Sequence, residues 1–258
     1  MRLAALGFLV TAVVACSGMD ARAPSPSAPS AAQPARRLLI VTHTTGFRHD
    51  SIPRAEAVLA ALSQARNIAP SFCRSADDVR RMLSADGLRG VDGVFFANTT
   101  GNLGIPDLGA FLSWIRSGHA FLGAHSASDT YHDERAYLEM IGAEFDTHGN
   151  QSQANLTIED RGHPATASLA SPFSIFDELY EFKSNPRPGV HVLLSLDHHP
   201  DDGHPAAGQP GDFVIAWTKT YGAGRIFYTA LGHRSEVWDD PRFQAHLSGA
   251  LAWALATE

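Results

Sequence analysis

The chain has 258 residues, of which 44% are hydrophobic and 18% are charged, a composition typical of a folded globular protein. Its formal net charge of -7 and the absence of a long basic run argue against a protein that binds nucleic acid. Thirteen histidines are many for a chain of this length, so their positions bear directly on function.

The first residues have the pattern of a bacterial lipoprotein signal. An apolar run follows Arg2, is too short to span a membrane, and ends in Val13-Val14-Ala15-Cys16. We therefore interpret residues 1–15 as a signal peptide and expect a lipid on Cys16 that anchors the chain in the bacterial cell envelope. The residue after Cys16 is not Asp, which favours the outer membrane over the inner one. A plain secretory signal with an incidental cysteine is the alternative.

Residues 16–36 are rich in Pro, Ser and Ala and lack periodic apolar residues, which indicates a tether. Residues 37–258 then form one predicted domain without an internal repeat. The only other cysteine, Cys73, lies in an apolar context and is expected in the core. With a lipid on Cys16, no intramolecular disulfide is possible.

The first half of the domain alternates strands and helices. Apolar runs at 37–44, 69–75, 91–100 and 119–126 predict strands, and amphipathic stretches at 51–66, 76–85, 105–118 and 133–144 predict helices. Ser51 is the expected N-cap of the first helix, with Pro53 in its first turn. Continuously apolar strands that alternate with helices indicate a parallel sheet covered on both faces.

The second half is mostly β. We predict strands within 154–160, 173–182, 191–197 and 212–233, the last containing a hairpin turn, and a closing helix at 240–256. In parallel sheets the ligand site lies beyond the carboxyl ends of the strands. Here those ends lead into three polar loops, "THTTGFRHD", "NTTGN" and "AHSASDTYHD".

The stretch "FLGAHSASDT" has the outline of a nucleophile elbow, a sharp strand-to-helix turn between small residues. The residue at its tip is His125, where an enzyme with a covalent mechanism would carry Ser or Cys. A histidine there can serve as an acid or base, a ligand-binding group or a metal ligand.

Several segments together resemble the ThuA-like proteins, named for trehalose utilisation. The resemblance covers nearly the whole domain and is carried by "GFRHDSIP", "NTTG", "FLGAHSASDT", "DELYEFKSNPR", "VHVLLSLD" and "GRIFYTALGH". It implies an α/β fold similar to flavodoxin and to class I glutamine amidotransferases, a three-layer sandwich with a mainly parallel sheet and a β-rich C-terminal half.

In the amidotransferases the elbow carries a cysteine, and a histidine comes late in the chain with a glutamate shortly after it. Here His233 and Glu236 are the plausible counterparts of that late pair. The thiol has no counterpart near the elbow. Because a glutaminase of that type forms a thioester, glutaminase activity is not expected.

Three kinds of chemistry remain open for the polar loops. We expect His125, His49, His233 and Asp129 to be catalytic, with acid–base chemistry centred on His125. A divalent metal is a second possibility, with His49 and His125 as its candidate ligands. Hydrogen bonding to sugar hydroxyls is the third; the expected substrate-binding residues are Asn98, Tyr180, Glu178 and His148.

Other histidines receive structural interpretations. His43 lies in or just beyond a strand. The stretch "DHHPDDGHP" is read as a solvated loop, although His198, His199, Asp201 and Asp202 could hold an adventitious metal. A retaining glycosidase would need two carboxylates, for which only Asp129 and Glu178 can be nominated.

These observations predict an enzyme of carbohydrate utilisation that acts on a disaccharide or on a keto sugar derived from one. The substrate class comes from the resemblance. Proton abstraction beside a sugar carbonyl suits a histidine-centred site better than glycoside hydrolysis does. The alternative is a surface lipoprotein that binds sugar without chemistry. The sequence leaves the oligomeric state open.

Overall fold

The computed structural model describes residues 36–256. The predicted signal peptide, the lipid on Cys16 and nearly all of the predicted tether lie outside the described residues and stay predictions. Among the described residues, no helix has the length and apolar character needed to cross a membrane.

The first half forms the predicted alternation of strands and helices. Its elements in chain order are β1 (Arg36–Val41), α1 (Ile52–Ala65), β2 (Ile68–Cys73), α2 (Ala76–Met82), β3 (Gly93–Ala97), α3 (Leu108–Arg116), β4 (Ala120–Ala124), the short 3-10 helix η1 (His125–Asp129) and α4 (Arg135–Ile141). Every residue of β3 and β4 is buried, as continuously apolar central strands require.

The second half is β-rich, as expected. It comprises β5 (Phe145–His148), β6 (Ser152–Ile158), β7 (Phe173–Asp177), β8 (Tyr180–Phe182), the 3-10 turn η2 (Arg187–Gly189), β9 (His191–His198), β10 (Pro210–Tyr221) and β11 (Gly224–Thr229). Two helices close the chain, α5 (Ser235–Asp239) and α6 (Pro241–Leu255). The interruption between β7 and β8 and the short helix α5 were not predicted.

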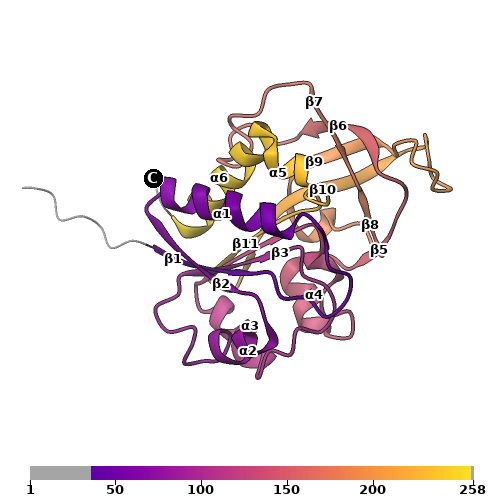
Figure 1. The fold of residues 1–258 in the computed structure, drawn as a ribbon. Helices are drawn as coiled ribbons and strands as arrows, with labels where there is room; N and C mark the ends of the chain where they lie inside the picture. The colour runs from indigo at the N-terminus through magenta and orange to yellow at the C-terminus, as the bar shows by residue number, and fades with distance from the viewer. Residues whose placement is uncertain (1–35, 257–258) are drawn as a thin grey trace, which may run out of the picture. The chain divides into compact units, whose positions relative to one another are not determined.

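One nine-stranded sheet organises the fold, in the order β2-β1-β3-β4-β11-β10-β9-β6-β7. The strands from β2 to β11 run parallel, and β10, β9, β6 and β7 continue the sheet in antiparallel pairs. Figure 1 shows α1, α5 and α6 on one face and α2, α3 and α4 on the other. The predicted three-layer α/β sandwich is therefore confirmed.

Strand β11 has a special place in this sheet. It is the last strand in the chain, yet it pairs in parallel with β4, with Thr229 beside Ala124. Both strands therefore end at the same edge. This register brings the elbow that follows β4 next to the loop that carries His233.

One local prediction is confirmed only in part: Ser51 stands at the N-cap position of α1, and a proline lies in its first turn. The Ser51 side chain, however, makes no capping hydrogen bond. Its hydroxyl donates instead to the carbonyl of Gly232 at 3.3 Å and accepts from the Asn98 amide at 3.0 Å. The residue therefore ties the start of α1 to the loop after β11, which a local capping rule does not foresee.

Candidate functional site

The elbow after β4 presents His125 at the edge of the sheet. His125 has a left-handed backbone, with a φ of 48°, and its side chain is fully buried. Its Nδ1 lies 2.9 Å from the carbonyl oxygen of Ala230. Because a carbonyl only accepts, Nδ1 must carry the proton, and in a neutral ring the lone pair is then on Nε2.

His233 reaches this nitrogen from the loop after β11. Its Nδ1 lies 3.2 Å from His125 Nε2. The buried carboxylate of Asp177, at the end of β7, holds that loop by accepting from the backbone N–H groups of Gly232 at 2.7 Å and Arg234 at 3.2 Å. His233 is thus oriented by two strands that are distant in sequence.

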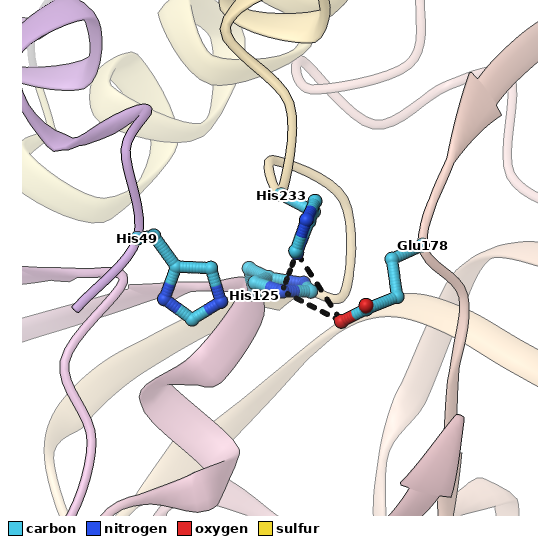
Figure 2. A group of neighbouring side chains, drawn as sticks. All are labelled: His49, His125, Glu178 and His233. Carbon is cyan, nitrogen blue, oxygen red and sulfur yellow. Dashed lines mark hydrogen bonds and ion pairs between the residues drawn. The ribbon is translucent and has the colours of Figure 1, made fainter. Parts of the chain in front are cut away.

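Glu178 enters from the interruption between β7 and β8. Its Oε1 lies 3.2 Å from His233 Nδ1 and 3.5 Å from His125 Nε2. Its Oε2 lies 3.2 Å from Nδ1 of His148, whose side chain is 42% exposed. Figure 2 shows the Glu178 carboxylate facing both histidines from the side opposite His49.

His49 completes the group from the loop between β1 and α1. It is buried, and its ring centroid lies 4.8 Å from that of His125 and 5.1 Å from that of His233. In Figure 2 one of its ring nitrogens faces His125. We call His49, His125, Glu178 and His233 the histidine–glutamate centre.

Burial and mutual contact set the charges of the centre. Burial, reinforced by the neighbouring His125 and His233, lowers the pKa of His49 to about 3, so this imidazole stays neutral. Burial alone would raise the pKa of Glu178, but close contact with His125 and His233 outweighs burial and holds that pKa well below its usual range. Burial opposes the charged form of His233, yet its bond to Glu178 prevails and raises its pKa.

Two aromatic rings flank the centre. Tyr180 is buried and packs its ring against that of His125, with centroids 4.1 Å apart, so it helps to fix the orientation of the imidazole. Phe47 is 67% exposed and meets His49 edge to face at 4.8 Å. Its backbone carbonyl accepts a hydrogen bond from Thr100 at 2.8 Å, which fixes the loop that presents the ring.

The structure gathers most of the predicted site residues but not all of them. His49, His125, His233, Glu178 and His148 converge as expected. Asn98 is fully buried, and its amide donates to Ser51 and to the Gly232 carbonyl, so in this structure it binds loops together. Asp129 Oδ1 lies 2.5 Å from His132 Nε2, and His132 also contacts Glu144.

Two sequence interpretations are corrected. Glu236 is not the carboxylate partner of His233, because its own side chain is 71% exposed and pairs with Arg234 at 3.0 Å. The "DHHPDDGHP" loop is not wholly solvated, because His199 and Asp202 are buried. His199 Nε2 lies 2.7 Å from Glu181, a partner from β8 that the loop's own composition does not reveal.

Two groups among the described residues could hold a metal ion. The ligand atoms of His49, His125, Glu178 and His233 all lie within 4.8 Å of one another, as do those of Glu181, His199 and His204. In the first group the sequence had pointed only to His49 and His125 as candidate ligands; in the second it had pointed to His199, as one of the residues that could hold an adventitious metal. Glu178 was read as a substrate-binding residue; its place within "DELYEF", interrupting a β pattern, was the available signal.

Comparison with protein families agrees with the fold. The ThuA family, described as "Trehalose utilisation", matches residues 37–254. The chain belongs to the ThuA family. Comparison with the curated proteins finds no match.

Several solved structures share the architecture. A ThuA-like protein from Bacteroides uniformis is 21% identical with a TM-score of 0.68, the match covering 89% of this chain and 95% of that one. A ThuA-like protein from Parabacteroides merdae is 18% identical with a TM-score of 0.69, covering 86% and 90%. A cytoplasmic protein from Salmonella typhimurium is 10% identical with a TM-score of 0.59, covering 85% and 98%. At these identities the likeness establishes the fold of this ThuA-family chain.

Proposed function

We propose that this ThuA-family chain is an enzyme that processes a sugar, and that its reaction takes place at the histidine–glutamate centre. One observation carries the proposal: three histidines and a carboxylate from four separate segments converge at the sheet edge where α/β proteins bind ligands. A fold does not need such a set of buried polar side chains for its stability.

The chemistry that suits this centre is proton transfer beside the carbonyl of a keto sugar. Imidazoles are the commonest proton-transfer groups in enzymes, and general acid–base catalysis contributes about 10²- to 10⁴-fold in rate. Glu178 connects the buried centre to the exposed ring of His148, which offers a path for a proton between the centre and solvent. Within residues 36–256 the one cysteine, Cys73, is buried in β2, and burial raises the pKa of its thiol to about 12, so it does not supply the thiolate that glutaminase chemistry needs.

A carbohydrate is the substrate class that family membership supports. The exposed ring of Phe47 beside His49 agrees with this, because an aromatic face can pack against the apolar C–H face of a sugar ring. We expect the sugar to lie between Phe47 and the exposed edge of His148.

Turnover of unmodified and 3-keto disaccharides by the purified full chain tests the proposal. We expect turnover of a keto disaccharide, and a decrease of about 10²-fold or more in kcat/KM for His125→Ala. His119→Ala is the matched control, because His119 immediately precedes β4, at the opposite end of the strand from the elbow, and bonds the Trp114 carbonyl. This control should keep wild-type turnover.

Two results would count against the proposal. Turnover that His125→Ala leaves unchanged would remove the centre from catalysis. Saturable sugar binding without turnover of any disaccharide would support the alternative function, a sugar-binding lipoprotein.

A further inference from the structure

We propose that the histidine–glutamate centre binds one divalent first-row transition-metal ion, with His49, His125, His233 and Glu178 as its protein ligands. The proposal goes beyond the proposed function, because ion binding does not depend on which sugar is processed or on whether one is.

The spacing of the donor atoms suits a single ion. His125 Nε2, His233 Nδ1 and Glu178 Oε1 form a triangle with sides of 3.2, 3.2 and 3.5 Å. Metal–ligand bonds of about 2.0–2.1 Å in tetrahedral geometry place neighbouring ligand atoms about 3.3 Å apart. The His49 donor lies within 4.8 Å of the other three, so a small movement of one ring closes the set.

Hydrogen bonds within the centre account for the positions of His125, His233 and Glu178, but not for that of His49. The Nδ1–H of His233 can be shared between His125 and Glu178. Among the described residues, the only hydrogen bond found for His49 joins its Nδ1 to Ser126 Oγ at 3.5 Å, the outer limit for such a bond. No hydrogen bond to the ring nitrogen that faces His125 in Figure 2 is found among the described residues, so this nitrogen can serve as a metal ligand.

Groups outside the centre hold its ligands in a metal-binding state. The Ala230 carbonyl accepts a hydrogen bond from Nδ1–H of His125, so the Nε2 lone pair of the neutral ring faces the centre. His148 contacts Oε2 of Glu178 and leaves Oε1 facing the histidines. Metal-binding histidines typically donate their second ring N–H to a carbonyl or carboxylate in this way, and ligating carboxylates are themselves hydrogen-bonded.

The donor set selects the class of ion. Three imidazoles and one carboxylate suit Zn²⁺, Fe²⁺, Co²⁺ or Ni²⁺, whereas Mg²⁺ and Ca²⁺ prefer all-oxygen sites. Four protein ligands would saturate tetrahedral zinc, while an ion that takes five or six ligands keeps positions for a sugar oxygen. Metal binding has one consequence for the proposed function. Because the histidines of the centre would hold the ion, His148 would be the residue that transfers the proton.

Metal titration of the full chain tests the proposal. Chelator-treated protein is titrated calorimetrically with Co²⁺, Ni²⁺, Zn²⁺ and Mg²⁺. We expect one transition-metal ion per chain and no saturable Mg²⁺ binding. His125→Ala and Glu178→Gln should each weaken binding by about 100-fold or more, since even outer-shell changes cost 10- to 100-fold.

The second histidine cluster supplies the matched control. His199→Ala removes a buried histidine that contacts Glu181, and it should leave the tight site intact. Glu178→Gln keeps the size of the side chain, and unfolding curves show whether each variant is folded. The proposal would be overturned if the folded wild-type chain bound no stoichiometric metal ion. Binding that survives His125→Ala and is lost in His199→Ala would also overturn it.

Turnover separates this inference from the proposed function. Stoichiometric metal without turnover of any sugar would refute the function and keep the metal site. Sugar turnover by chelated protein that binds no ion would do the reverse. His148→Ala removes an outer-shell contact and should weaken metal binding by about 10- to 100-fold, less than the loss of a ligand does. With the ion at saturating concentration it should still lower kcat, a combination that a purely structural role would not give.

Discussion

His125 keeps its left-handed backbone because neighbouring side chains hold the elbow on both sides. The Tyr228 hydroxyl, from β11, donates to the His125 carbonyl at 2.7 Å and lies 2.8 Å from Ser128 Oγ. The Tyr137 hydroxyl, from α4, donates to the carbonyl of Ala127 at 2.8 Å. A strained residue persists only where its surroundings fix it in this way, and such residues concentrate at functional sites.

Tyr228→Phe should therefore destabilise the chain. The change leaves the ring in place but removes the hydroxyl that bonds the buried His125 carbonyl and Ser128 Oγ, which then keep only their mutual contact at 3.4 Å. This loss should cost about 1–3 kcal/mol. Urea unfolding of wild type and variant measures the difference. Tyr221→Phe at the end of β10 is the control, because Tyr221 packs under Arg116 and lies away from the elbow. An equal decrease in the free energy of unfolding in both variants would show that the hydrogen bond to the elbow does not stabilise the chain more than the Tyr221 hydroxyl does.

At the scale of elements, α6 packs closely against the segment after β6. A Cβ on Gly249 would lie 1.9 Å from the Pro164 carbonyl oxygen, so only glycine allows this approach. One turn earlier, His246 is fully buried, and its Nδ1 lies 2.8 Å from the carbonyl of Ala165. Burial lowers the pKa of His246 to about 4, so it is neutral in the folded chain near neutral pH.

This histidine should make stability depend on pH. Its pKa is depressed on folding, so below about 6.5 the unfolded chain takes up a proton that the folded chain does not. Its contribution to the free energy of unfolding is therefore lost as pH falls from about 6.5 to about 4, by up to about 3 kcal/mol. Urea unfolding at several pH values should show a shallower acid loss for His246→Leu than for wild type. An equal loss of stability with falling pH in wild type and His246→Leu would contradict the proposed contribution of His246.

At the scale of the whole molecule, the fold was predictable where local pattern decides it. The strands around Val94 and Leu122 are short apolar runs followed by amphipathic helices, and both features lie within one sequence window. The order of β10, β9, β6 and β7 was not predictable, because antiparallel pairing between distant segments leaves little local trace.

The candidate site was also predictable only in part. His49 and His125 could be placed together because parallel strands end at one edge, and the family resemblance supplied His233. The inward role of Glu178 was missed because residues 173–182 were predicted as strand. The role depends on a break after Asp177, whose carboxylate accepts a hydrogen bond from the distant backbone N–H of Gly232. The burial of His199 depends likewise on Glu181 from another strand.

The most direct test of the metal centre is anomalous diffraction from crystals of the full chain grown with excess Co²⁺. We predict one strong peak per chain, bounded by His49, His125, His233 and Glu178, with bonds of about 2.0–2.2 Å. A peak only at Glu181, His199 and His204, or a histidine–glutamate centre without an ion while Co²⁺ is in excess, would contradict the prediction.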